Sequence, residues 1–173
     1  TGVEPWAAAE PHVGAGSSQR SELVRADRAP WVSAARIMVV DDRADVRELL
    51  RDYLESEGYT VDALGDATEA LKRVAEFRPG VVLLDIRLPG LSGLSALREI
   101  RALHREVGVI MVTGVGDRTI AEESLALGAF DYVTTPIDFT YLLWSIETHF
   151  VTRQLLREPG DTTRAIGCGQ PRG

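Results

Sequence analysis

Aspartates end two of the most apolar runs in the sequence. Residues 37–40 are followed directly by Asp41 and Asp42, and residues 81–84 by Asp85. Each run has the length and β-branched content of a buried strand in a parallel sheet. The acids should therefore lie at the carboxyl edge of that sheet, where open α/β folds place their ligand sites. Taken alone, the acidic pair also suits a solvated turn.

Carboxylates that converge on one crevice repel one another. Two like charges about 4 Å apart cost roughly 4 kcal/mol at an effective dielectric constant of about 20. A shared proton or a bound cation relieves this repulsion, and hard oxygen ligands suit Mg²⁺. The acidic cluster is therefore the candidate functional site, and Mg²⁺ is the expected cofactor.

Five alternations of strand and helix are predicted to position these acids. The expected strands cover residues 36–40, 60–64, 81–84, 109–112 and 130–134. Helical spacing of apolar residues predicts helices over residues 44–57, 66–77, 93–103, 117–127 and from 138 onwards. Because crossover connections between parallel strands are right-handed, these units predict an α/β fold, a doubly wound parallel sheet with helices on both faces.

Individual residues mark the expected helix ends. Asp66 and Asp138 are expected N-caps, and Gly58 and Gly128 are expected to end helices. The third helix is expected to direct Leu103 inward with the rest of its apolar face.

Length and composition indicate one globular domain. The chain has 173 residues, of which 45% are hydrophobic and 26% are charged. We expect this domain to cover residues 36–152. A flexible leader is expected over residues 1–35, with a short helix near residues 20–28, and a flexible tail over residues 153–173.

Composition also disfavours several classes of function. No apolar stretch reaches the roughly 18 to 20 residues that cross a bilayer, and the amino-terminal stretch lacks the apolar region of a secretory signal. The formal net charge of −7, without a basic stripe, argues against direct binding of nucleic acid. The single cysteine, Cys168, forms no disulfide within the chain, so a cytoplasmic location is expected.

Short motifs follow the expected strands in the order of one known family. They are Asp41-Asp42, Asp85, residues 88–93, Thr113 in Met-Val-Thr-Gly, and residues 131–136, Asp-Tyr-Val-Thr-Thr-Pro. Together they resemble a response-regulator receiver domain of two-component signalling, over residues 36 to about 152. The resemblance implies a five-stranded, flavodoxin-like sheet with strand order 2-1-3-4-5.

The resemblance implies a phosphoacceptor in a phosphorelay rather than an enzyme acting on an external substrate. Asp85 would take a phosphoryl group from a histidine kinase or phosphotransfer protein. Asp42 would bind Mg²⁺ directly and Asp41 mainly through water. Asp85 and the backbone carbonyl of Arg87 would complete the protein ligands. The residue types suit this chemistry, because a carboxylate oxygen attacks phosphorus while the metal neutralises charge.

Two further residues are the implied switch. Thr113 would hydrogen-bond the phosphoryl group, and the side chain of Tyr132 would swing inward when Thr113 moves. A threonine that merely ends a strand, and a half-buried strand tyrosine, are the ordinary alternatives. Arg87, two residues past the acceptor, is the implied modulator of phosphate lifetime, with a solvent-facing arginine as its alternative.

Thr135 departs from the family, which has a lysine before the proline at this point. That lysine pairs with the acceptor carboxylate and then with the phosphoryl group. A hydrogen bond to a charged group contributes roughly 1.5–3 kcal/mol, against about 1 for a neutral one. The coupling of phosphorylation to shape change is thus expected to weaken by about one to two decades unless Arg87 substitutes. Pro136 is expected to follow a cis peptide bond, as in the family.

The expected output is protein–protein contact through the helix at residues 117–127, the fifth strand and the last helix. Ile120, Leu142 and Trp144 are candidate anchors, and this surface also suits a homodimer. The output partner or output domain is expected outside this chain.

Three alternatives remain open. One is an interaction or dimerisation module on the same fold that ignores phosphorylation. Another is a metal-dependent phosphohydrolase, in which an acid commonly stands where this chain has Arg87. A flavodoxin-like cofactor protein is disfavoured, because the acids after the first strand would repel a flavin phosphate.

Overall fold

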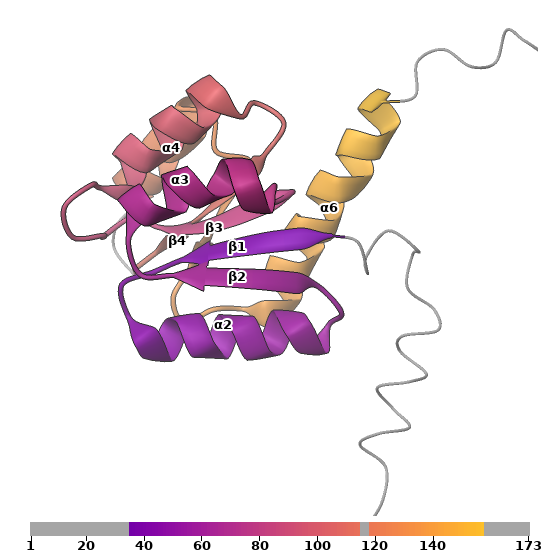
Figure 1. Cartoon of the computed structure of the whole chain (residues 1–173), viewed down its shortest axis with the longest axis horizontal. Coiled ribbons are helices and arrows are strands. Elements are labelled where there is room, and N and C mark those ends of the chain that lie inside the picture. Colours follow the sequence, from indigo (N-terminus) through magenta and orange to yellow (C-terminus); the bar gives the residue numbers. More distant parts are fainter. Residues whose placement is uncertain (1–34, 115–117, 158–173) are drawn as a thin grey trace, which may run out of the picture.

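A computed structural model describes residues 35–114 and 118–157, in which five strands alternate with five helices (Figure 1). The elements are β1 (Arg36–Val40), α2 (Ala44–Ser56), β2 (Thr60–Leu64), α3 (Ala67–Phe77), β3 (Val81–Asp85), α4 (Gly93–Leu103), β4 (Gly108–Thr113), α5 (Arg118–Ala126), β5 (Asp131–Thr134) and α6 (Phe139–Arg157).

The strands form one parallel sheet in the order β2-β1-β3-β4-β5. This order confirms the predicted fold class. The register pairs Val40 with Leu84 and Asp85 with Val112, so the ends of β1, β3 and β4 lie side by side. The loops that leave these strands therefore begin at one common edge of the sheet.

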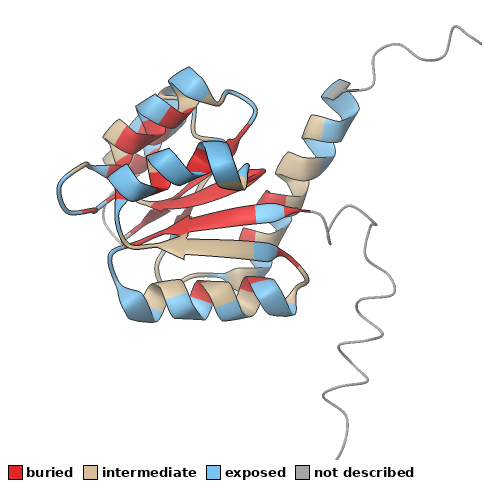
Figure 2. Cartoon of the chain, in the orientation of Figure 1, coloured by how far each residue is buried: buried red, intermediate tan, exposed pale blue. Residues whose placement is uncertain are grey.

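Helices cover both faces of the sheet, and each face has its own core. Met38, Leu84 and Met111 belong to the core on the face covered by α3 and α4. Ile37 and Leu83 belong to the opposite core, which packs against α2 and α6. Figure 1 shows the two layers of helices, and Figure 2 shows between them the buried strand β1 beside the less buried edge strand β2. Strands buried on both faces explain why the apolar runs in the sequence are nearly continuous.

Local capping sets the helix ends much as the sequence predicted. The carboxylate of Asp66 accepts a hydrogen bond from the Glu69 amide at 2.8 Å, and that of Asp138 accepts one from the Tyr141 amide at 3.1 Å. Gly58 and Gly128 adopt φ values of 90° and 97°, which glycine tolerates without steric cost.

Some details differ from the expectations. Leu103 is 72% exposed, so its predicted inward orientation was wrong. It lies in the last turn of α4. Helical spacing alone does not show at which residue a helix extends beyond the elements that pack against it. β3 includes Asp85, and α6 continues to Arg157, beyond the boundary expected at residue 152. The leader, the helix near residues 20–28 and the last part of the tail lie outside the described residues.

Candidate functional site

The three predicted acids meet at the carboxyl edge of the sheet. Asp41 and Asp42 follow β1, and Asp85 ends the neighbouring strand β3. One carboxylate oxygen from each residue lies within 4.8 Å of the others. Asp41 is buried, Asp85 is half-buried and Asp42 is exposed. The predicted convergence of the three carboxylates is therefore confirmed.

Backbone amides in the two loops orient the buried acids. The Arg43 amide donates to Oδ1 of Asp41 at 2.8 Å, and the Arg87 amide donates to Oδ1 of Asp85 at 3.1 Å. Both are tight turns of the type that aspartate favours. The Arg47 side chain adds a hydrogen bond of 2.7 Å from Nη1 to the backbone carbonyl of Asp41. Sequence reasoning missed Arg47, whose position one turn into the helix after the acidic pair was the available signal.

Burial is the main reason that these acids resist ionisation. It raises the pKa of Asp41, an effect partly offset by the hydrogen bond from the Arg43 amide and reinforced by the charge of Asp85. Burial likewise raises the pKa of Asp85, with the charge of Asp42 adding to it. The sequence had pointed to the mutual repulsion of the acids, which here is the smaller of the two causes. A bound cation would oppose both causes, because it stabilises the ionised form of each acid.

A glycine brings α4 against the backbone of the acidic site. A Cβ atom on Gly93 would overlap the backbone carbonyl oxygen of Asp85 and lie 2.8 Å from the Cα atom of Ile86. The Gly93 amide also donates to the Ile86 carbonyl at 3.2 Å. Sequence reasoning identified Gly93 as a helix start but missed this contact, because only the folded loop brings the two segments together.

Thr113 and Thr135 face each other across neighbouring strand ends. Thr113 is only 2% exposed, and its hydroxyl has a long hydrogen bond of 3.4 Å to the Gly114 carbonyl. The Thr135 amide and hydroxyl both donate to the Thr113 carbonyl, at 2.9 and 3.4 Å. The peptide bond between Thr135 and Pro136 is cis, as expected. Thr135 is thus tied to the backbone at the end of β4.

The remaining predicted residues lie in different environments. Tyr132 is half-buried and packs against the core on the α3 and α4 face, while Arg87 is exposed. Trp144 is 59% exposed and remains a candidate contact residue. Leu142 is 1% exposed, so its choice as an interface anchor was wrong: it lies in the core beneath α6.

The donor set of the cluster fits Mg²⁺. An octahedral Mg²⁺ ion holds neighbouring oxygen ligands about 3 Å apart, at metal–oxygen distances of about 2.1 Å. The three carboxylate oxygens lie within 4.8 Å of one another, a spacing that suits one ion held directly by some of them and through bound water by another.

Comparison with curated proteins identifies relatives that are much longer than the matched region. The C4-dicarboxylate transport transcriptional regulatory protein DctD of Rhizobium meliloti is 35% identical over 133 residues, which cover 77% of this chain and 29% of the relative. The transcriptional regulatory protein AruR of Pseudomonas aeruginosa is 45% identical over 108 residues, 60% of this chain and 44% of the relative. The chain therefore spans less than half the length of either relative.

Solved structures agree with this comparison. The receiver domain of NtrX from Brucella abortus is 36% identical, with a TM-score of 0.65, over 67% of this chain and 98% of that structure. Among the described residues, no helix is long and apolar enough to span a membrane. A family model described as the response regulator receiver domain matches residues 37–147. This match agrees with the strand order and with the three acids at the carboxyl edge of the sheet. The chain therefore belongs to the response regulator receiver family, the signalling domains of two-component systems.

Proposed function

We propose that this receiver domain accepts a phosphoryl group on Asp85, with Mg²⁺ bound beside it, and signals through protein–protein contact. The convergence of Asp41, Asp42 and Asp85 at one edge of the sheet is the observation that carries the proposal. A site without a ligand has little physical reason to gather carboxylates whose ionisation burial already opposes.

Each acid has a proposed role. Asp42 binds Mg²⁺ directly and Asp41 mainly through water, and Asp85 and the backbone carbonyl of Arg87 complete the protein ligands. The bound ion supplies neutralising charge for the transferring phosphoryl group. An Asp85 oxygen forms the new bond to phosphorus while the bond to the donor's histidine nitrogen breaks, and the electron pair of that bond stays on the imidazole.

Thr113 and Tyr132 are the proposed switch. Within the part of the chain that the structure describes, the hydroxyl of Thr113 has one hydrogen bond, a long one of 3.4 Å, so it can turn towards a phosphoryl oxygen on Asp85 at little cost. Tyr132 lies half-buried on the strand next to β4 and would move inward in response.

Thr135 makes this receiver atypical. Lys72 is the single lysine of the chain and belongs to α3, so no lysine lies near the end of β5. The hydroxyl of Thr135 reaches the Thr113 carbonyl and supplies no charge. We propose that the coupling of phosphorylation to the shape change is about one to two decades weaker than it would be with a lysine at position 135. We also propose that Arg87 supplies part of the missing charge and modulates the phosphate lifetime.

Receiver domains of response regulators interact with kinases and output domains. We propose a histidine kinase or phosphotransfer protein as the donor. The proposed output surface, which also suits a homodimer, consists of α5, β5 and α6, where Trp144 is exposed. We further propose that the output partner or output domain lies outside this chain, that the protein is cytoplasmic, and that this domain makes no direct contact with nucleic acid or membrane.

Phosphorylation can be tested with acetyl phosphate and Mg²⁺, read by intact-protein mass. We expect a gain of one phosphoryl group in the wild type and none in Asp85→Asn. Asp45→Asn is the matched control, because Asp45 is an exposed acid of the next helix that pairs with Arg43 instead of joining the cluster. No gain in the wild type, under conditions that label an ordinary receiver, would favour a module that ignores phosphorylation.

The role of Thr135 needs a separate measurement. Restoring the family's lysine in Thr135→Lys should change the phosphate lifetime and enlarge the chemical-shift response of Thr113 and Tyr132 to phosphorylation. Thr134→Lys, at the exposed neighbouring position, is the matched control. An unchanged lifetime and response in Thr135→Lys would contradict the proposed role of this position.

A further inference from the structure

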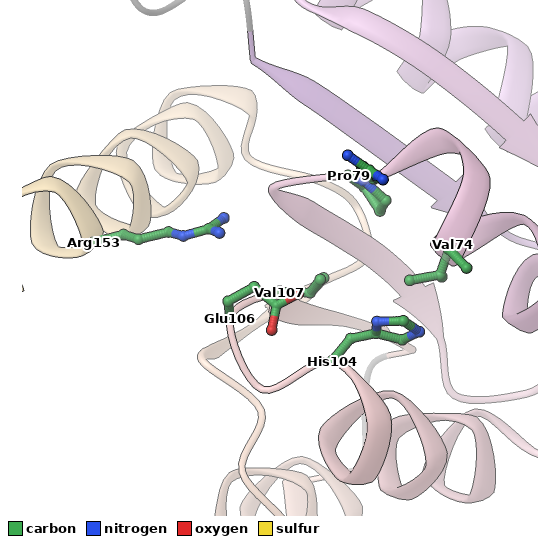
Figure 3. A pocket seen from close by; sticks show the side chains of 8 residues that line it. Val74, Pro79, His104, Glu106, Val107 and Arg153 are labelled. Atoms are coloured by element: carbon green, nitrogen blue, oxygen red, sulfur yellow. The ribbon is translucent and has the colours of Figure 1, made fainter. Parts of the chain in front are cut away.

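A cavity lies at the amino-terminal edge of the sheet, opposite the edge that carries the acidic cluster. It has a volume of about 500 Å³ and is bounded by the end of α3, the loop between α4 and β4, and the outer half of α6. Figure 3 shows Arg153 reaching from α6 towards the loop that carries His104 and Glu106, with Val74 and Pro79 on the far side. This volume is within the range of small-molecule sites.

The charge of this cavity is opposite to that of the acidic cluster. Arg78 and Arg153 line it, against one carboxylate from Glu106. The neighbouring His149 is affected by the same positive charges. Burial, and then the charges of Arg153 and Arg101, lower its pKa. Positive charge therefore predominates at this edge, and an anion entering the cavity would meet it.

Arg78 has an unusual backbone for an arginine. Its φ is 52°, and among the described residues it is the one non-glycine residue with a positive φ. Its amide donates to the Val74 carbonyl at 2.9 Å and so ends α3. Glycine would meet this backbone requirement without steric cost. A cation at a helix C-terminus interacts favourably with the helix dipole, and here the same residue also lines the cavity.

Apart from the imidazole of His104, apolar groups line the rest of the cavity. Val74, Pro79 and Val107 are buried residues that contribute to its wall. An apolar or planar body would rest against them, and a guanidinium group stacks readily on an aromatic ring. Glu106 disfavours a second negative charge on its side and would accept a hydrogen bond from a hydroxyl or amino group.

We propose that this cavity binds a small organic anion, in which a phosphate, sulfonate or carboxylate group lies between Arg78 and Arg153 and an aromatic or aliphatic body rests on Val74 and Val107. The site is separate from the acidic cluster at the other edge of the sheet. Its occupation does not depend on the proposed phosphorylation of Asp85.

The probe for this proposal is 1-anilinonaphthalene-8-sulfonate, titrated into ¹⁵N-labelled protein at constant ionic strength. We expect amide shifts at residues 74–78, 80 and 104–107, and at least tenfold weaker binding of the uncharged analogue N-phenyl-1-naphthylamine. Arg78→Gln/Arg153→Gln should also weaken probe binding at least tenfold. Arg51→Gln/Arg98→Gln removes the same charge outside the cavity and should leave binding within about twofold of the wild type.

Three results would overturn the proposal: no shifts at the cavity amides, equal weakening in the two double variants, or equal binding of the charged and uncharged probes. Asp85→Asn, which removes the proposed phosphoacceptor, should bind the probe as the wild type does. The experiment therefore distinguishes a failure of the anion-binding proposal from a failure of the phosphorylation proposal.

Discussion

The two edges of the sheet differ in both charge and packing. The carboxyl edge gathers Asp41, Asp42 and Asp85, with oxygens within 4.8 Å of one another. The amino edge presents Arg78 and Arg153 around a cavity. The same five strands therefore end in opposite electrostatic environments.

Glycines show how differently the two edges are built. At the carboxyl edge, Gly93 lets α4 begin against the backbone of Asp85. At the amino edge, Gly80 and Gly108 leave room for the rings of Phe150 and His149, which hold α6 against the strand starts. Backbone contact thus supports one edge and side-chain packing the other. Burial raises the pKa values of Asp41 and Asp85 at the carboxyl edge, where a ligand is proposed to compensate it, and lowers the pKa of His149 at the amino edge.

Gly93→Ala tests the backbone contact and should have the largest effect. The new methyl group overlaps backbone atoms of Asp85 and Ile86, which cannot move without displacing the loop. We expect the free energy of unfolding, measured by urea denaturation, to fall by about 3 kcal/mol. Gly65→Ala is the matched control, because its Cβ would meet only the flexible end of Arg47, at 3.1 Å. Equal losses in the two variants would contradict a special role for Gly93.

Gly108→Ala tests the side-chain packing at the other edge. The new Cβ would lie 2.6 Å from Cε1 of His149, so the ring must shift. A ring can move more easily than a backbone, and we expect a loss of about 1–2 kcal/mol in the free energy of unfolding. A double-mutant cycle with His149→Ala should show coupling between the two positions. Additive effects would show that the ring does not cause the loss.

Mg²⁺ should stabilise the protein through the carboxyl edge. At tenfold its dissociation constant, a ligand that binds only the folded state adds about 1.4 kcal/mol to the free energy of unfolding. We expect thermal denaturation to show this gain in the wild type and not in Asp42→Asn/Asp85→Asn. NaCl at the same ionic strength serves as the control. An undiminished gain in the double variant would place the ion elsewhere.

The pH dependence of stability should show the cost of the buried acids. Folding raises the pKa of Asp85 above its unfolded value near 3.9, so the ionised group destabilises the fold at neutral pH. This penalty falls as the pH falls through the folded pKa and is absent below the unfolded value. Metal-free Asp85→Asn should therefore melt about 2–4 °C above the wild type at pH 7, and this difference should shrink towards pH 4.

Asp45 provides a control, because folding shifts its pKa in the opposite direction to that of Asp85. A hydrogen bond from Arg43 lowers the pKa of Asp45, so its ionised form favours the folded state at neutral pH. Asp45→Asn should therefore gain no thermal stability at pH 7. A gain equal to that of Asp85→Asn would mean that any lost negative charge stabilises this acidic protein, irrespective of burial.

Much of the fold and the acidic site could be predicted because the signals are local. A buried strand requires a short apolar run, and an N-cap requires a side-chain oxygen at the helix start, as at Asp66 and Asp138. Parallel strands place their carboxyl ends together, so the meeting of Asp42 with Asp85 followed from the strand pattern.

The features that escaped prediction depend on how segments far apart in sequence pack. Helical spacing predicted that Leu103 faces inward, whereas it lies in solvent. Leu142, chosen as an interface anchor, lies in the core. The contact of Gly93 with Asp85 is likewise set by the folding of a loop.

The order of residues by itself determined the strands, the helices and the three acids at their ends, because each depends on neighbours within a few positions. Only the tertiary structure decided that Arg47 donates to the Asp41 carbonyl, that Thr135 faces Thr113, and that an arginine-lined cavity opens beside α6. These contacts join elements whose separation depends on the packing of the whole core, and no local pattern encodes that distance.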